Sequence, residues 1–177
     1  MQLVQPEKKY FASYRNAIQE NKTYGVDTYQ LMDTEETELF TTLENLRTGS
    51  NLLKGWVKAT YLWMIDKGEF VGEIDIRHSL TDSLLHFGGN IGYYVRPSRW
   101  GEGIGTYMLG LGLEYCKTEL HLERVLLTCN DDNYGSIRVI ENNGGLLHDT
   151  IEQTIQGKDL VTRRYWIKIE LPLQTNE

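Results

Sequence analysis

The segment from 95 to 106 limits the possible folds of this chain more than any other, because it places three glycines at alternating positions. Gly101, Gly103 and Gly105 lie between an expected strand and an expected helix. Glycines leave backbone N–H groups uncovered by side chains, and a helix N-terminus adds about half a positive charge. The segment therefore predicts a loop that binds a pyrophosphate, with a solvated turn as the alternative. The dinucleotide-binding spacing is excluded, because it requires a glycine where this chain has Thr106.

The hydrophobic patterns around this loop predict one mixed α/β domain over residues 1–177, with a partly antiparallel sheet. Pro6 is placed in the first turn of the first helix, and Asp33 with Glu36 resembles a capping pair of the second. These two helices are expected to end at Gly25 and Gly49. We expect helices over 6–24, 33–48, 103–117 and 133–142, and strands over 61–65, 70–78, 90–95, 124–129, 146–153 and 160–170.

The strand expected over 70–78 carries the most informative alternation. Period-2 spacing places Glu73 and His78 on opposite faces. Glu73 shares its face with Asp75 and Arg77, which favours a solvated or salt-bridged face. His78 shares its face with two isoleucines, which favours a hydrogen-bonded imidazole in the core.

Composition and charge exclude several classes of partner. The 25 acidic and 18 basic side chains give a net charge of −7, and the basic residues are scattered, which argues against nucleic acids and anionic membranes. No apolar run approaches the ~20 residues of a membrane span, and the N-terminus lacks a signal-peptide pattern, so a cytoplasmic protein is expected. The two cysteines, Cys116 and Cys129, form no metal-ligand spacing with the four histidines, so we expect reduced thiols and no metal.

Two motifs resemble those of the GNAT N-acetyltransferase superfamily. The run Trp100-Gly-Glu-Gly-Ile-Gly105 resembles its acetyl-CoA loop, Q/R-x-x-G-x-G/A, and Asn133-x-x-Ser136 followed by Gly144 is similar to its N-x-x-A/S helix. The resemblance covers about 60–168. Shorter stretches within it resemble an uncharacterised bacterial branch of predicted acetyltransferases.

The resemblance implies a GNAT fold and an activity. The fold would be a central mixed, mostly antiparallel sheet flanked by helices and splayed between the family's strands four and five, here 90–95 and 124–129. Acetyl-CoA would be the co-substrate, and its acetyl group would pass directly to a primary amine in a ternary complex. Non-catalytic CoA binding or sensing, or the use of a longer acyl-CoA, are the alternatives.

The acceptor would be a small-molecule or protein amine. Residues 21–34, with Arg77 and His78, would recognise it, and the acidic balance weakly favours a cationic acceptor such as a polyamine. A homodimer is compatible with the sequence.

The family pattern also implies which residues contact CoA. They surround the glycine loop and the second motif: Tyr94, Val95, Arg99, Trp100, Gly101, Gly103, Ile104, Gly105, Thr106, Asn133 and Ser136. Trp100 stands where the family usually has Gln or Arg, so Arg99 could supply the missing charge. Trp100 itself would either stack on the cofactor or pack on the surface.

Amide formation requires a base, because an amine with a pKa near 10 is mostly protonated at neutral pH. Several GNAT enzymes place a glutamate where this chain has Asn90, which cannot act as a base and could orient substrate or water. Glu73 and His78, acting through a water molecule, are the preferred candidates, with His86 as a third.

The thiolate leaving group also lacks its usual proton donor. Many family members have a tyrosine where this chain has Ile140, so Tyr93, Tyr94, Tyr134 or water would have to supply the proton. Cys129 as an acyl-carrying nucleophile is disfavoured, because no histidine is positioned to activate it.

Overall fold

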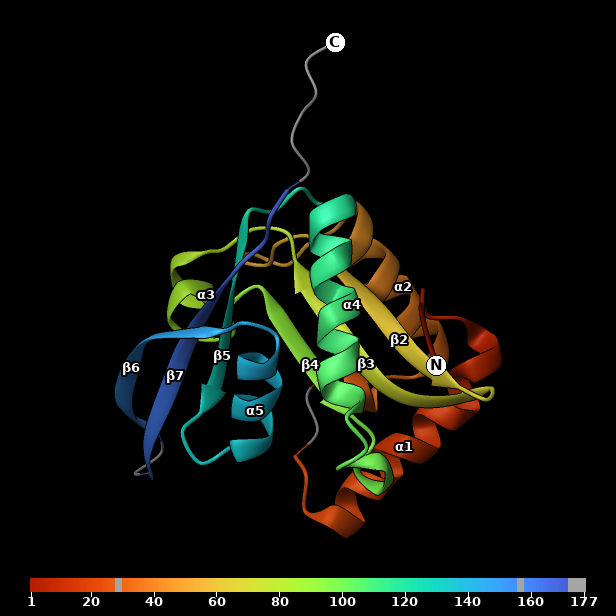
Figure 1. Ribbon diagram of the computed structural model, residues 1–177. Coiled ribbons are helices and arrows are strands. Elements are labelled where there is room, and N and C mark those ends of the chain that lie inside the picture. Colours follow the sequence, from red (N-terminus) through yellow and green to blue (C-terminus); the bar gives the residue numbers. More distant parts are fainter. Residues whose placement is uncertain (28–29, 156–157, 172–177) are drawn as a thin grey trace.

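The computed structural model describes residues 1–27, 30–155 and 158–171, and its strands form two sheets that stand side by side (Figure 1). The first has the order β1-β2-β3-β4, with β1 (Gln2–Val4), β2 (Ala59–Asp66), β3 (Glu69–Arg77) and β4 (Ile91–Val95). The second has the order β5-β7-β6, with β5 (Arg124–Asn130), β6 (Leu146–Ile155) and β7 (Lys158–Lys168). Every pairing within these sheets is antiparallel, and the expected division between β4 and β5 is confirmed.

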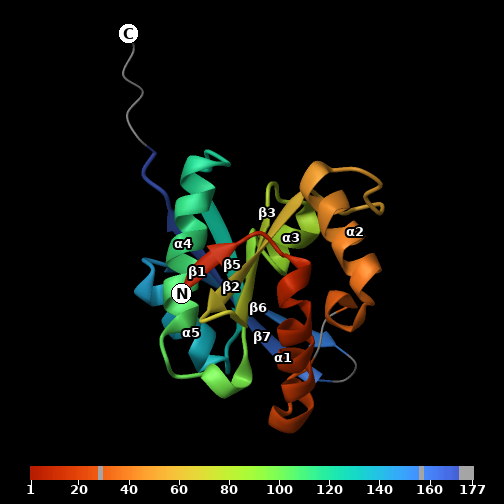
Figure 2. The ribbon, with the colours of Figure 1, turned by 90° about the vertical axis from the view of Figure 1, so that its right-hand side faces the viewer.

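Helices cover both faces of the first sheet. The helices on this sheet are α1 (Phe11–Tyr24), α2 (Glu36–Thr48) and α4 (Ile104–Thr118). α3 (Asp82–His86) lies in the connection between β3 and β4, and α5 (Tyr134–Asn142) packs against α4 and β5. 3₁₀ turns lie at Lys8–Tyr10, Gln30–Asp33 and Pro97–Arg99. Figure 2 shows α1 and α2 on one side of this sheet and α4 on the other. The α+β architecture matches the expected fold class.

The first two helices end at the expected glycines, whereas their starts differ from prediction; the expected starts of α4 and α5, at Gly103 and Asn133, are confirmed as their N-cap residues. Gly25 and Gly49 both adopt left-handed backbone angles, with φ of 66° and 83°, and end α1 and α2 as expected. The first helix begins at Phe11 because a 3₁₀ turn precedes it, so Pro6 is outside its first turn.

The expected capping pair of the second helix is wrong. Asp33 belongs to a 3₁₀ turn, and the N-cap residue of α2 is Glu35, which makes no side-chain cap hydrogen bond. Two short elements were also missed. β1 has three residues, too few for an alternation pattern, and the five-residue α3 is signalled only by Thr81, whose hydroxyl accepts a hydrogen bond from the Leu84 amide.

The two faces of the first sheet pack against different cores. On the α1 side, Tyr14, Trp63 and Phe70 are fully buried, and the rings of Tyr14 and Trp63 stack with centroids 4.8 Å apart. On the α4 side the core is mainly aliphatic, and a Cβ added at Gly112 would overlap the Ile74 side chain. That glycine lets α4 lie directly on β3, and α4 in turn positions the glycine loop at its N-terminus.

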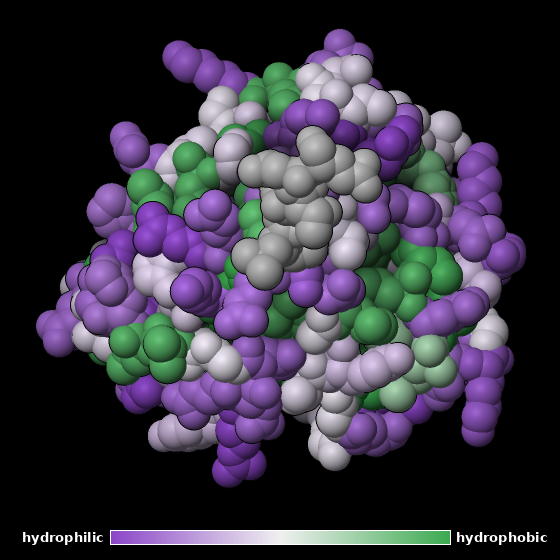
Figure 3. Space-filling view, turned by 45° about the horizontal axis from the view of Figure 1, so that its top comes forward, coloured by the Kyte–Doolittle hydropathy of each residue, from purple (hydrophilic) through white to green (hydrophobic). Residues whose placement is uncertain are grey.

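The surface carries both hydrophobic and hydrophilic side chains. In Figure 3, hydrophobic side chains form several separate patches among hydrophilic ones. Among the described residues, no helix combines the length and apolarity that a membrane span requires.

Candidate active site

The glycine loop between β4 and α4 leaves a row of backbone N–H groups without partners. Gly101 and Gly103 adopt left-handed angles, with φ of 81° and 76°, and Gly103 is the N-cap residue of α4. The first-turn amides of Ile104, Gly105 and Thr106 have no acceptor in the part of the chain that the structure describes. A Cβ added at Gly101 or Gly103 would meet no atom within 4 Å. The loop therefore needs glycine for its backbone angles and has open space beside it, which suits a pyrophosphate.

Gly105 has a different role from the two glycines before it. It has helical angles, and a Cβ there would lie 3.0 Å from Cγ2 of Val139 on α5. Asn143 reinforces the same contact, because its Nδ2 donates to the Thr106 carbonyl at 3.1 Å and to the Val139 carbonyl at 2.8 Å. The start of α4 is thus held against α5, through an asparagine that the sequence analysis missed.

Trp100 is fixed in orientation but half exposed. Its indole Nε1 donates to the Val95 carbonyl at 2.7 Å, and its ring meets that of Tyr24 edge-on at 6.0 Å. The side chain remains 53% exposed beside the loop. These contacts show packing against the surface and leave part of the side chain open to a ligand.

Arg99 is engaged within the protein. Its Nη2 lies 3.0 Å from Oδ2 of Asp66, and its Nε donates to Glu102 at 2.8 Å. Its charge is therefore balanced by two carboxylates, and it braces the loop against the end of β2. The structure does not present it as a free phosphate ligand.

The C-terminal half of α1 also holds this region. Glu20 accepts hydrogen bonds from Nε and Nη2 of Arg96 at 2.8 and 2.5 Å and from the Ser98 amide at 3.4 Å. The Tyr94 hydroxyl lies 2.8 Å from Oδ1 of Asn21, so its side chain points to α1. These contacts join residues more than 70 positions apart, and no local pattern could have revealed them.

The second motif faces β4 across the division between the sheets. Asn133 caps α5, its Oδ1 accepting from the Ser136 amide at 3.0 Å. The Tyr93 hydroxyl donates to the Ser136 carbonyl at 3.2 Å, which links β4 to α5. Burial raises the pKa of Tyr93 well above its ordinary value, so the phenol keeps its proton at neutral pH.

Glu73 is buried, which corrects the expectation of a solvated strand face. It is 3% exposed, and the indole Nε1 of Trp63 donates to its Oε2 at 2.7 Å. Burial and, secondarily, the neighbouring Asp75 raise its pKa well above the ordinary value. The salt-bridged part of the expectation applies further along the strand, where Nη2 of Arg77 lies 2.9 Å from Oδ2 of Asp75.

His78 lies far along the sheet from the glycine loop. Val95, which leads into the loop, pairs with Gly72 at one end of β3, whereas His78 follows the other end of that strand. Its Nε2 lies 2.9 Å from the Thr60 hydroxyl, and burial, with Lys58 nearby, lowers its pKa. The structure does not bring His78 together with Glu73 or with the loop.

Asn90 is buried and has a partner for each of its polar groups. Its Oδ1 accepts from the Leu126 amide at 2.9 Å, and its Nδ2 donates to the Arg77 carbonyl at 3.2 Å. Its backbone N–H and carbonyl bond to the same two residues, each at 2.7 Å. A side chain engaged in this way bridges β3 and β5 and is not directed at an opening.

These features can be compared with known proteins. A family model described as the acetyltransferase (GNAT) domain matches residues 5–145. The chain belongs to the GNAT acetyltransferases. No curated protein sequence matches it.

Solved GNAT structures show the same fold at low identity. A ribosomal-protein-S5-alanine acetyltransferase from Vibrio fischeri is 14% identical, with a TM-score of 0.73 over 95% of this chain and 92% of its own. A spermidine N-acetyltransferase from Vibrio cholerae is 17% identical, with a TM-score of 0.65 over 95% of each chain. A microcin C7 self immunity acetyltransferase, in complex with acetyl-CoA and AMP, is 19% identical, with a TM-score of 0.69 over 94% of this chain and 91% of its own.

The residue at the usual GNAT tyrosine position is part of the core. Ile140 is 1% exposed, and the adjacent Gly145 packs so closely that a Cβ there would overlap it. Tyr134 is 69% exposed at the start of α5. Burial raises the pKa of the Cys129 thiol to about 11, so it carries little thiolate at neutral pH. Among the described residues, no group of histidines, cysteines and carboxylates is arranged to hold a metal ion.

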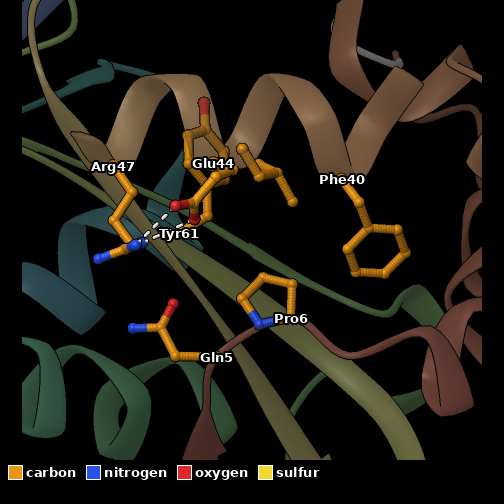
Figure 4. Close-up of a pocket in the computed structure, with 7 residues that line it drawn as sticks. Gln5, Pro6, Phe40, Glu44, Arg47 and Tyr61 are labelled. Carbon is orange, nitrogen blue, oxygen red and sulfur yellow. Dashed lines mark hydrogen bonds and ion pairs between the residues drawn. The ribbon is translucent and has the colours of Figure 1, made fainter. Parts of the chain in front are cut away.

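A small cavity lies apart from these GNAT residues. Its volume is about 80 Å³, and it is enclosed by the N-terminal segment, α2 and β2 (Figure 4). The residues that line it are Gln5, Pro6, Phe40, Leu43, Glu44, Arg47 and Tyr61, with Arg47 paired to Glu44 at 2.7 Å. None of them is a candidate for CoA binding or catalysis.

Proposed function

We propose that this chain is an acetyl-CoA-dependent N-acetyltransferase that passes acetyl directly to a primary amine in a ternary complex. The observation that carries the proposal is the row of unpaired N–H groups at Ile104, Gly105 and Thr106, which follows the C-terminal end of β4, the strand that borders β5. Such donors at a helix N-terminus bind phosphate oxygens. The related fold solved with acetyl-CoA supports the same assignment.

The CoA site would follow the division between the sheets. The amides of Gly101 and of Gly103 to Thr106 would bind the pyrophosphate, because open space lies beside them. Asn133 and Ser136 would contact the pantetheine arm or adenosine phosphates from α5. Val95 and Trp100 would line the path, and Tyr94 would do so only through its backbone, because its side chain points to α1. Arg99 would hold the loop and make no direct phosphate contact.

Glu73 is the protein base that the structure favours. A carboxyl with a raised pKa is better matched to an amine near neutral pH than an ordinary one. Because it is 3% exposed, it would act through a water molecule. Asn90 has no basic atom, and His78 lies at the other end of β3.

Tyr93 is the proton donor that the structure favours. Its hydroxyl bridges the two sides of the opening and carries its proton at neutral pH. Burial raises its pKa, which makes it a weaker acid toward sulfur. It would protonate the sulfur as the C–S bond of the tetrahedral intermediate breaks and the amide remains. A thiolate with a pKa near 8.5 needs little help, so this contribution is small.

The acceptor would be a small-molecule or protein amine. The related folds include enzymes named for a ribosomal protein and for spermidine. Part of the expected acceptor segment, residues 28–29, lies outside the described residues. We place the activity in a single domain over 1–177, acting in the cytoplasm.

A non-catalytic CoA-binding module is the second candidate. Ile140 in the core and the fully engaged Asn90 favour it, because neither can transfer a proton. The test measures CoA binding by calorimetry and thiol release from acetyl-CoA and a longer acyl-CoA with a panel of amines. Amine-dependent thiol release supports the transferase. Binding without release favours the module, and absence of CoA binding overturns both.

A further inference from the structure

The two sheets are joined at one end by a compact polar junction. Asn90 precedes β4, and its backbone N–H donates to the carbonyl of Leu126 in β5 while its side-chain Oδ1 accepts from the Leu126 amide. The same side chain reaches back to β3 through the Arg77 carbonyl. One residue therefore ties three strands together at the point from which β4 and β5 diverge.

The residues before Asn90 bring the backbones unusually close. A Cβ added at Gly89 would overlap the carbonyl oxygen of Leu126, and Gly89 has a φ of 64°. The Gly88 amide donates to the hydroxyl of Thr128 in β5 at 3.0 Å. We call Gly88, Gly89, Asn90, Leu126 and Thr128 the closed end.

Charged side chains from both sheets hold the connection that leads into the closed end. Arg77 donates from Nη1 to the carbonyls of Gly88 and Gly89 at 3.2 and 3.4 Å. From β7, Nη1 of Arg164 donates to the Leu85 carbonyl at 2.8 Å. The segment containing α3 is thus fastened to both sheets.

We propose that Asn90 is a positioning residue that sets where β4 and β5 part and thereby holds the CoA cleft at its working width. The inference rests on the proposed function, because it concerns the cleft in which CoA would lie. Two strands fixed at one end open by an amount that depends on that fixed point, so a displacement there is transmitted to the Tyr93 and glycine-loop end. A packed, hydrogen-bonded junction transmits such shifts because it does not deform freely.

The chemistry of the junction explains why an amide is needed. Asn90 must donate to the Arg77 carbonyl and accept from the Leu126 amide at the same time. An ionised carboxylate can only accept, and it would face the Arg77 carbonyl with a second oxygen. A protonated carboxyl offers one donor and one acceptor and can reproduce both bonds.

The test is therefore Asn90→Asp, with the CoA dissociation constant measured by calorimetry at about pH 5 and about pH 8 and divided by the wild-type value at each pH. Asn90 is 4% exposed, so burial should raise the pKa of the introduced carboxyl and keep it protonated at the lower pH. The ratio is expected near one at the lower pH and roughly tenfold or more at the higher pH, where the carboxyl ionises. Charged or titratable groups on the packed elements are Arg77 and Asp75 of β3, His86 of α3 and Arg164 of β7. These groups are the same in the variant and in wild type, so the ratio at each pH removes their contribution.

The matched control is Asn51→Asp, an exposed left-handed position that aspartate also tolerates. Its ratio should stay near one at both values of pH. An Asn90→Asp ratio that is near one throughout, or raised equally at both values of pH, overturns the proposal. Failure of the wild type to bind CoA would instead overturn the proposed function.

A second variant covers the case in which Asn90→Asp does not fold. Thr128→Val keeps the branched shape of the side chain and replaces the hydroxyl, which accepts from the Gly88 amide, with a methyl group. We expect a pH-independent loss of CoA affinity of roughly threefold, with native circular dichroism. Unchanged affinity in this variant would contradict the inference.

Discussion

The two ends of the β4–β5 division use polar groups in opposite ways. At the closed end, each polar group of Asn90 has a partner, and Gly88 donates to Thr128. At the other end, which we call the open end (residues 100–106 with 133–136), the amides of Ile104 to Thr106 have none in the described chain. The contrast teaches that pairing marks where the fold is held together, and unpaired donors mark where a ligand would bind.

Glycine at the closed end should matter most for stability. Gly89→Ala would force a Cβ onto the Leu126 carbonyl at a left-handed position. We expect the free energy of unfolding to fall by about 3 kcal/mol or more, measured by urea denaturation. Gly55→Ala is the control, because Gly55 is also left-handed but has no atom near its Cβ, and it should cost about 1 kcal/mol. Equal losses would show that close approach at the closed end is unimportant.

Removing the basicity of Glu73 should have the largest effect on the reaction. Glu73→Gln is expected to lower kcat by about 100-fold at neutral pH, because the amide cannot take a proton. The pH–rate profile should also lose its rising limb. A variant with the wild-type rate and pH dependence would leave bulk water as the base.

The pH dependence of the free energy of unfolding tests separately whether the pKa of Glu73 is raised. Because the folded pKa of Glu73 is raised, the native state keeps a proton that the unfolded state releases, and wild-type stability falls as pH rises above the ordinary glutamate pKa. The glutamine side chain resembles the protonated form and does not titrate. The stability of the variant relative to wild type should therefore increase with pH in urea denaturation. A pH-independent difference would contradict the raised pKa.

Glycine at the open end should matter mainly for CoA. Gly103→Ala places a Cβ in the open space beside the free amides. We expect CoA affinity to fall about tenfold, with a stability cost of about 1 kcal/mol. Calorimetric titration tests this, with Gly68→Ala as a left-handed control in the β2–β3 turn. If the two variants bind CoA equally well, the glycine loop is not the pyrophosphate site.

The smallest effect is expected at Tyr93. Tyr93→Phe removes the hydroxyl that bonds the Ser136 carbonyl, and kcat should fall about threefold, because the thiolate leaves readily without an acid. Initial-rate kinetics measure it. Tyr134→Phe, at an exposed position, should leave the rate unchanged. Equal rates in both variants and wild type would identify water as the proton donor.

Local patterns predicted much of the fold. Glycines after helical stripes located the ends of α1 and α2, and alternation with a turn located the β2–β3 hairpin. The glycine loop and the helix after it were found where the spacing placed them. Each of these features is encoded within about ten neighbouring residues, where backbone preference is decisive.

Contacts between distant segments were not predictable in the same way. Alternation predicted on which face of the strand Glu73 lies, but it could not predict that this face is buried. The face is buried by an aromatic cluster that contains Tyr14, Trp63 and Phe70. Asn90 appeared as a substitute for a catalytic glutamate, because its partner Leu126 lies 36 positions away. Side chains that bond across such distances leave no local trace in one sequence.

The division between the sheets also has a consequence for how the molecule opens. Each sheet completes its backbone pairing internally, and the amides of Asn90 and Leu126 bond across the gap between them. Parting of the two halves would break these bonds and open the core that the sheets share, but it would leave the pairing within each sheet intact, so it needs less free energy than global unfolding. Hydrogen exchange at these two amides should therefore be faster than at the centre of β3. Its rate should report how often the two sheets part.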